Sequence, residues 1–315
     1  MSIEVVLQQM IIIFILIGIG MLLFQKEMLS EMTSKQISGL IVNVTNPALL
    51  ICSAFDDGPK VSIQELALSL GIYAAIYAIL IAFSFLIPYI LRVPNRYHYA
   101  YRMLTIFGNT GFIGIPLASA VLGTESLIFV SIFNLLFNIL IYTFGISTLQ
   151  KAAAKQSDSD CDTSATSSRW QKIINAGTVS AVATIVFYLG NFDVPVIITS
   201  TMSYIGRATT LLSMLVLGVS VAQMAPKEIF SHPRLYVFTL LRQILIPIGC
   251  ILLVRPFVHN TLILNTMALM LAVPAANMPL MLSKQLNVET DTISQGIILT
   301  TILSLVTIPV VSLFL

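Results

Sequence analysis

The sequence predicts an all-α integral membrane protein with ten transmembrane helices. Hydrophobic residues make up 57% of the 315 residues and charged residues only 10%, and the mean hydropathy is +0.94. Soluble domains are far more polar than this. Segments such as IIIFILIGIGMLLF are apolar on every side and do not alternate, so they favour membrane-spanning helices over a transmembrane β-barrel.

Ten segments have the length and composition of membrane spans, because a helix needs about 20 mostly apolar residues to cross a bilayer. These segments are residues 5–24, 36–55, 64–91, 99–121, 125–149, 171–190, 199–223, 234–254, 261–284 and 291–314. The residues before the first span include Glu4 and no basic residue, and no small-residue cleavage site follows. We therefore expect a retained helix and not a signal peptide.

The basic residues predict the orientation of the spans, since Lys and Arg concentrate in cytoplasmic loops. Of the 16 Lys and Arg residues, twelve fall in one set of alternate loops, two (Lys60 and Arg255) in the opposite set, and two (Arg207 and Arg242) within spans. The richer set, which we place in the cytoplasm, consists of Lys26, Lys35, Arg92, Arg96, Arg102, Lys151, Lys155, Arg169, Lys172, Lys227, Arg234 and Lys284. With ten spans, both termini then lie on the outer side of the membrane. We expect the protein to lie in the cell membrane.

A polar segment divides the chain into two halves. Residues 151–172 are rich in Ser, Asp, Ala and Thr and have few large apolar residues, which predicts a flexible cytoplasmic linker. Five spans lie in residues 1–150 and five in the part that continues through residues 173–315, so the second half enters the membrane with opposite polarity. This arrangement predicts two inverted five-helix repeats, which are typical of secondary transporters.

The fourth span of each half contains residues that interrupt a helix. GNTGFIGIPL at 108–117 corresponds to AVPAANMPLM at 272–281. Proline removes a backbone donor and glycine permits non-helical angles, so both helices should unwind near the middle of the membrane. Unpaired backbone is costly in lipid, and such a break persists only where protein or a water-filled cavity satisfies it. Paired breaks indicate a transport site, and a kink used only for packing is the alternative.

Polar and charged residues within the spans favour an anionic ligand. A broken helix places an anion-attracting N-terminal end in mid-membrane, where Asn109, Thr110 and Asn277 add polar side chains. No Asp or Glu is predicted near the centre of a span, whereas Arg207 and Arg242 are. An intramembrane guanidinium is costly and therefore a functional candidate. Each Arg either pairs with a substrate carboxylate or stabilises the negative end of a broken helix.

Other polar residues are less informative. Asn46 either faces the same cavity or joins helices, and Asn134 and Asn138 fit helix–helix hydrogen bonding. The three histidines lack metal-ligand spacing, and no nucleotide-binding or nucleophile motif is present. We therefore expect no metal, no cofactor, no nucleic-acid partner and no enzymatic activity.

Three longer stretches are shared with a known family. They are FGNTGFIGIPL in the fourth span, VPAANMPLMLSKQLNVETDTISQGIILTTILSLVTIPV across the ninth and tenth, and LIGIGMLLFQKEMLSEMTSKQISGLIVNVTNPALL in the first two. The sequence resembles the auxin efflux carrier family along essentially its whole length, in the bacterial malate or malonate permease-like branch.

The resemblance implies a scaffold of spans 1, 2, 6 and 7 and a mobile transport domain of spans 3–5 and 8–10, with broken spans 4 and 9 crossing. It implies an elevator-type carrier of dicarboxylate or auxin-like anions, and a homodimer through the scaffold helices fits this plan. Alternatives are a sodium-coupled symporter of the bile-acid type, a membrane receptor or an integral-membrane enzyme. We expect Arg242 to stabilise the helix break, and the candidate substrate-binding residues are Asn46, Asn109, Thr110, Gly111, Pro116, Arg207, Pro274, Asn277 and Pro279.

Overall fold

The computed structural model describes residues 3–55, 61–156, 174–190, 192–223 and 233–315. Within these ranges the secondary structure is helical, apart from one isolated β-bridge between Gly108 and Ala275. The all-helical class is therefore confirmed. Residues 157–172 of the predicted linker lie outside the described residues, as do Lys60 and Lys227.

The first half of the chain contains five helical segments. The first is α1 (Ile3–Gln25) and the third is α4 (Ile63–Ile90). The second is a continuous helix of α2 (Glu31–Leu40), the π-helical η1 (Ile41–Thr45) and α3 (Asn46–Ser53). The fourth is interrupted and contains α5 (His98–Ile106), the π-helical η3 (Thr110–Gly114) and α6 (Ile115–Leu122). The fifth joins α7 (Leu127–Leu140), the π-helical η5 (Ile141–Gly145) and α8 (Ile146–Gln156).

The second half follows the same order of helices. The sixth and seventh segments are α10 (Ala176–Gly190) and α11 (Val196–Ala222). The eighth joins α13 (Pro233–Leu240), the π-helical η6 (Leu241–Leu245) and α14 (Ile246–Val254). The ninth is interrupted between α15 (Thr261–Ala272) and α16 (Met278–Gln285), and the tenth is α17 (Asp291–Ser312). Short 3₁₀ turns precede α5 and α7 and follow α14, at Asn95–Tyr97, Thr124–Ser126 and Arg255–Phe257.

Seven helices of the described chain are long and apolar enough to cross a membrane, which supports a multi-pass membrane protein. Three of the predicted spans contain shorter apolar helices, Thr110–Leu122, Ala176–Gly190 and Thr261–Ala272. The first and third are short because the fourth and ninth segments are interrupted. Ten complete spans therefore stay a prediction.

Three of the four π-helical segments in the described ranges come directly before a helix with proline in its first turn. Pro47, Pro116 and Pro247 follow η1, η3 and η6. A proline ring clashes with the carbonyl group four residues earlier and cannot donate to it. A wider π turn moves this carbonyl away, so each helical segment continues through its proline.

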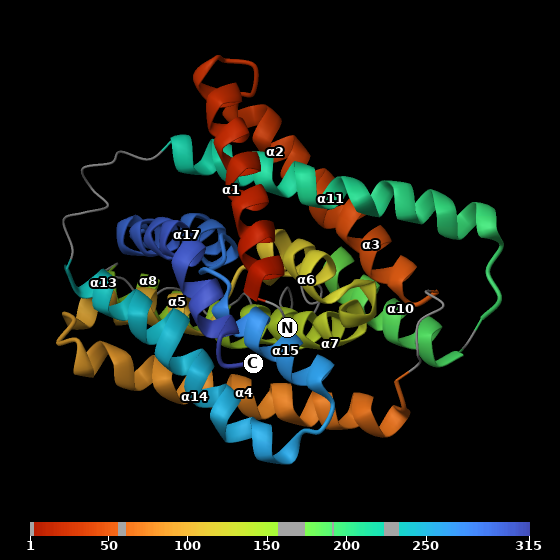
Figure 1. Cartoon of the computed structure of the whole chain (residues 1–315). Coiled ribbons are helices and arrows are strands. Elements are labelled where there is room, and N and C mark those ends of the chain that lie inside the picture. The colour runs from red at the N-terminus through yellow and green to blue at the C-terminus, as the bar shows by residue number, and fades with distance from the viewer. Residues whose placement is uncertain (1–2, 56–60, 157–173, 191, 224–232) are drawn as a thin grey trace.

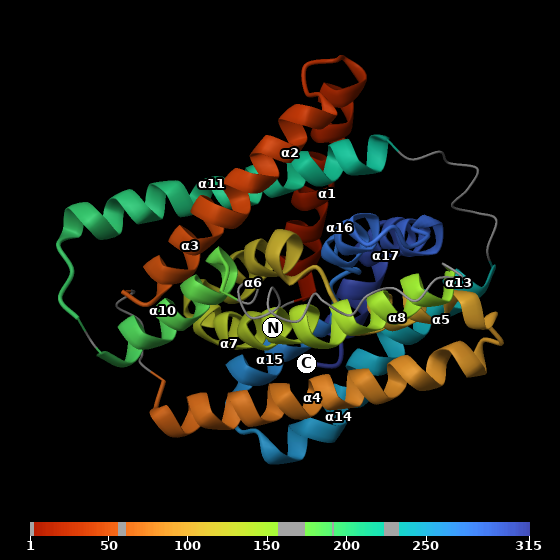
Figure 2. The same cartoon turned by 180° about the vertical axis from the view of Figure 1, so that it is seen from behind.

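Glycines bring the backbones of α1, α11 and α3 into direct contact. A Cβ atom on Gly20 of α1 would lie 2.4 Å from the carbonyl oxygen of Leu215 in α11. In α11, a Cβ atom on Gly206 would lie 2.8 Å from Leu49 Cα in α3. Small residues allow close helix packing of this kind in membranes. Figures 1 and 2 show α2, α3 and α11 along one side of the molecule, opposite α4 and α14, and α1 runs from that side toward the middle.

The other helices pack around the two interrupted segments. α4 contacts α5 and α7, α17 contacts α5, α13 and α15, and α14 contacts α15. α10 packs against α3 and so joins the group of α1, α3 and α11. This group meets the other helices where α10 and α3 contact α7, where α11 contacts η3, and where α1 contacts α6 and α17. This packing is compatible with the predicted scaffold and transport units, whose relative movement stays a prediction.

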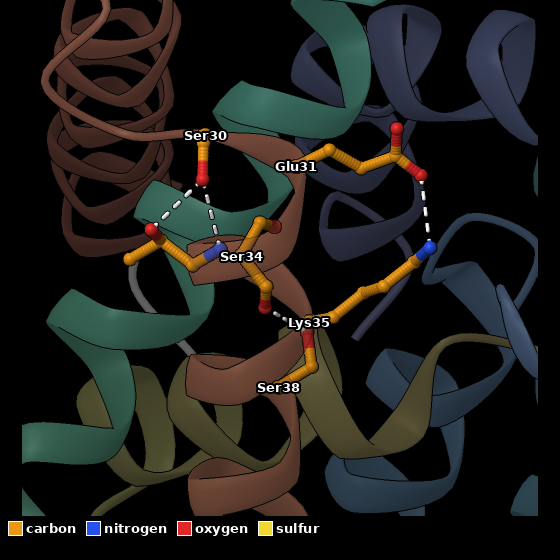
Figure 3. Close-up of polar contacts among 6 residues, drawn as sticks. Ser30, Glu31, Ser34, Lys35 and Ser38 are labelled. Carbon is orange, nitrogen blue, oxygen red and sulfur yellow. Dashed lines mark hydrogen bonds and ion pairs between the residues drawn. The ribbon is translucent and has the colours of Figure 1, made fainter.

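The second helical segment begins with a capped polar turn (Figure 3). The hydroxyl oxygen of Ser30 accepts a hydrogen bond from the Thr33 amide at 3.1 Å, and Lys35 pairs with Glu31 at 3.0 Å. The Ser38 hydroxyl donates to the Ser34 carbonyl oxygen at 2.8 Å. The cap fixes the start of the helix that later carries Asn46.

Candidate functional site

The fourth and ninth segments are unwound around Gly108 and Pro274, as predicted, whereas Gly111 and Gly114 lie within the π-helical η3. In the first break, α5 ends at Ile106 and Phe107 has extended backbone angles, φ −101° and ψ 98°. In the second, α15 ends at Ala272 and Val273 has φ −59° and ψ 150°. The α-helix in each segment resumes with proline in its first turn, Pro116 in α6 and Pro279 in α16. Each proline thus lies at the start of the half-helix that follows the break, and the unwound residues come before it in the chain.

The two breaks are paired with each other through their backbones. The Asn109 amide donates to the Pro274 carbonyl oxygen at 2.7 Å, and the Ala276 amide donates to the Phe107 carbonyl oxygen at 2.9 Å. Gly108 and Ala275 form the antiparallel bridge between these two bonds. Each break therefore satisfies part of the unwound backbone of the other, which meets the requirement for non-helical backbone within a membrane.

Arg242 of η6 donates hydrogen bonds to carbonyl groups at the C-terminal ends of α5 and α15, the two half-helices that come before the breaks. Its Nε atom lies 3.2 Å from the Leu104 oxygen in α5, and its Nη1 atom lies 2.6 Å from the Leu271 oxygen in α15 and 2.9 Å from the Val273 oxygen. The residue is only 2% exposed. The last carbonyls of a helix have no partner within the helix and carry partial negative charge. The guanidinium therefore lies between two negative half-helix ends, as expected of a residue that stabilises the breaks.

Gln243, the residue after Arg242, adds a second set of contacts at the ninth segment. Its Nε2 atom donates to the Thr300 carbonyl oxygen at 3.0 Å and lies 3.5 Å from the Ala272 oxygen. The Thr300 hydroxyl oxygen in turn accepts from the Ala275 amide at 3.1 Å. The sequence interpretation did not include Gln243 or Thr300. The polar pair Arg-Gln within an otherwise apolar span was the available signal for Gln243.

The N-terminal ends of the two returning half-helices differ. Asn109 caps η3, because its Oδ1 atom accepts from the Phe112 amide at 3.1 Å. At α16, Asn277 makes no side-chain cap and is partly exposed. Pro279 contributes no N–H group to the first turn of α16. The amide groups in this turn therefore keep their partial positive charge without a side-chain acceptor from the N-cap.

Buried polar atoms without a hydrogen-bond partner occur beside the first break. The Asn46 Nδ2 atom donates to the Gly111 carbonyl oxygen at 3.2 Å, and the Thr110 hydroxyl donates to Asn134 Oδ1 at 2.6 Å. In the described chain, the atoms left without a partner include Asn46 Oδ1, Asn109 Nδ2 and Asn134 Nδ2. Leaving a buried polar atom unpaired costs about 1–3 kcal/mol. We call Asn46, Asn109, Thr110 and Asn134 the amide cluster.

Arg207 makes no hydrogen bond to the amide cluster within the described ranges. It is exposed on α11, beside a shallow hollow whose other lining residues are Ser200, Ser203 and Tyr204. Its neighbours Gly206 and Thr209 are buried, and Gly206 faces α3. Within the described ranges, no hydrogen bond or ion pair joins Arg207 to either break. The structure thus brings together Asn46, Asn109, Thr110 and Gly111 on one side and joins Asn109 to Pro274, but it does not bring Arg207 to them.

No group of three or more His, Cys, Asp or Glu side chains that could hold a metal ion occurs in the part of the chain that the structure describes. A comparison with curated proteins finds no match. A family described as "Membrane transport protein" matches residues 5–312, nearly the whole chain. With its apolar helices and paired interrupted segments, the chain belongs to this family of membrane transporters, the auxin efflux carrier family.

Proposed function

We propose that the protein is a secondary carrier for a small organic anion, such as a dicarboxylate or an auxin-like carboxylate. The observation that carries this proposal is the pairing of two interrupted helices beside the amide cluster. Asn109 links the two, since its backbone pairs with Pro274 while its Nδ2 atom is buried without a partner. A substrate oxygen that accepts from such an amide would remove an unfavourable buried group.

The charge distribution around the breaks supports an anion as the substrate. Arg242 offsets the negative ends of α5 and α15. The positive ends of η3 and α16 have no charged partner among the contacts of the described residues, so they favour a carboxylate. The guanidinium adds positive potential close behind Gly108, where a Cβ atom would lie 2.8 Å from its Nη2 atom.

The contacts of Arg242 favour a carrier without sodium over the symporter of the bile-acid type. In transporters with broken helices, unwound carbonyls and half-helix C-terminal ends are the groups that coordinate a coupling cation. Here a guanidinium already binds the carbonyls of Leu104, Leu271 and Val273. A fixed positive charge at this position makes a sodium ion unnecessary for stabilising the breaks. We therefore expect uptake to be independent of sodium.

Transport would follow an elevator-type mechanism in a protein of ten spans, with two inverted repeats, a cytoplasmic 151–172 linker and both termini outside. The glycine contacts among α1, α11 and α3 support a rigid scaffold, because backbones in direct contact cannot slide without separating. Among the described residues, one hydrogen bond, from Asn46 to Gly111, joins this scaffold to the first break, so a displacement would need to break little polar contact there. A dimer through the scaffold helices is compatible with this plan.

The direct test is uptake of labelled malate, malonate and indole acetate into proteoliposomes, with and without a sodium gradient. We expect Asn109→Ala and Asn277→Ala to reduce uptake at least about tenfold, since each removes an interaction near the substrate. Asn43→Ala is the matched control, because Asn43 is exposed and its Nδ2 atom donates to the Gly39 carbonyl oxygen in its own helical segment. Wild-type rates in both site variants would rule out the crossing as the substrate site, and Arg207→Gln at a wild-type rate would remove Arg207 from it.

A further inference from the structure

A guanidinium group is stacked on an aromatic ring at the outer surface of α4 and α5. The Cζ atom of Arg102 lies 4.2 Å from the centre of the Phe85 ring. The Phe85 ring also contacts Phe144 of η5, whose ring centre lies 6.1 Å away at an interplanar angle of 81°. Phe85 is 41% exposed, so the stack lies at the surface. The ring attracts the guanidinium through a cation–π interaction at this distance.

Arg102 has no hydrogen-bond acceptor among the described residues. Its Nε atom is buried without a partner, and within the described ranges the residue forms neither a hydrogen bond nor an ion pair. An Arg side chain has five N–H donors, and leaving them unpaired next to hydrocarbon is costly. This donor set fits an anion with several oxygen atoms, such as a phosphate, which Arg binds through two parallel bonds.

The surroundings of Arg102 are those of a membrane interface. Phe85 lies one turn before the end of α4 at Ile90, and Arg102 lies one turn after the start of α5 at His98. Tyr89 is 65% exposed and packs edge-on against His98 at 5.1 Å between ring centres. Exposed tyrosines and arginines at the ends of membrane helices lie at the level of the lipid headgroups.

We propose that Arg102, with Phe85 and Tyr89, binds the phosphate of an anionic phospholipid in the cytoplasmic leaflet. The cytoplasmic side follows from the basic loops of the sequence, which include Arg92 and Arg96 between these two helices. A lipid fits better than a soluble phosphate, because Leu86 and Ile90 are 50% and 57% exposed on the same helix end and suit an acyl chain. This lipid site is separate from the amide cluster and does not depend on the proposed substrate.

The test measures the binding of phosphatidylglycerol and phosphatidylcholine to the purified full-length chain by native mass spectrometry. We expect a preference for phosphatidylglycerol that Arg102→Gln weakens about fivefold to tenfold, as for the loss of one Arg contact at an anionic surface. Phe85→Leu keeps the charge but removes the stacked ring, and we expect it to weaken binding about twofold to fivefold. Lys26→Gln is the control, because it removes one exposed basic residue from another predicted cytoplasmic loop.

Two outcomes would overturn the lipid site. The first begins with an unchanged lipid preference in Phe85→Leu. If the preference is then also unchanged in Arg102→Gln, or if Lys26→Gln weakens it as much as Arg102→Gln does, the lipid is not bound specifically at Arg102 and only general electrostatic attraction remains. The second is full competition by soluble glycerol phosphate at the same concentration as the lipid, which would make the site one for free phosphate. If Arg102→Gln does not fold, the comparison of Phe85→Leu with Lys26→Gln decides alone.

Discussion

Arg242 lies so close to Gly108 that a Cβ atom on the glycine would stand 2.8 Å from the guanidinium Nη2 atom. The same Cβ would lie 3.0 Å from Val273 Cγ2 and 3.4 Å from the Met270 carbonyl oxygen, so it would meet the ninth segment as well as the guanidinium. Gly108 is therefore the position where the two interrupted helices and the buried cation approach each other most closely among the glycines of the first break.

We expect Gly108→Ala to lower uptake strongly and to destabilise the protein by about 1–3 kcal/mol, the usual cost of overpacking a filled interior. The methyl group would push the guanidinium away from its carbonyl acceptors. Uptake in proteoliposomes and thermal unfolding in detergent measure the two effects. Gly39→Ala is the control, because a Cβ atom on Gly39 meets nothing within 4 Å. Equal stability and uptake in both variants would contradict the close packing at Gly108.

Arg242→Gln should be among the most destabilising single changes in the protein. It removes the charge between two helix ends and leaves the Leu104, Leu271 and Val273 carbonyls without their donor. Each buried unpaired group costs about 1–3 kcal/mol, although such costs do not simply add. Arg242→Lys keeps the charge but not the fork of donors, and we expect it to be intermediate. In thermal unfolding, stability should decrease from the wild type to the Lys variant to the Gln variant. A Gln variant as stable as the wild type would contradict this role.

The glycine contact between α1 and α11 predicts a difference between two neighbouring positions. A Cβ atom on Gly20 would lie 2.4 Å from the Leu215 carbonyl oxygen, whereas one on Gly18 meets nothing within 4 Å. Gly20→Ala should separate the helices and destabilise the protein by about 1–3 kcal/mol. Gly18→Ala should have no such cost and gain up to about 1 kcal/mol from helix propensity. Thermal unfolding of the two variants side by side tests this contact. An equal change in stability in both variants would exclude the close contact between Gly20 and Leu215.

Local chemistry made the helical class and the position of both breaks predictable from the sequence. Long apolar runs have few structures available in a bilayer, and Gly108 and Pro274 disfavour a helix wherever they stand. The π-helical turns before Pro47 and Pro247 were not predicted. The sequence showed a proline in each span, but the wider turn that accommodates it depends on packing around the helix.

Contacts between distant segments were beyond the sequence interpretation. Arg207 and Arg242 both read as single basic residues within apolar spans, yet Arg242 is 2% exposed and Arg207 lies at the surface. Which side of a helix faces a neighbour depends on the whole fold when the helix is apolar all round, because no polar face marks the outside. Asn134 read as a helix-joining residue and does join α7 to η3, but the position of its partner Thr110 beside the break was not predicted.

The bond between Thr110 and Asn134 allows a test that separates packing from substrate binding. Thr110→Val removes the donor and leaves Asn134 Oδ1 buried without a partner, whereas Thr110→Val with Asn134→Leu removes both groups. We expect the single change to destabilise the protein by about 1–3 kcal/mol and the double change to recover part of this loss. Uptake by the double variant should not follow its stability. If the polar pair of Thr110 and Asn134 binds the substrate, the double variant stays inactive although its stability recovers, and recovery of both would leave the pair with a packing role only.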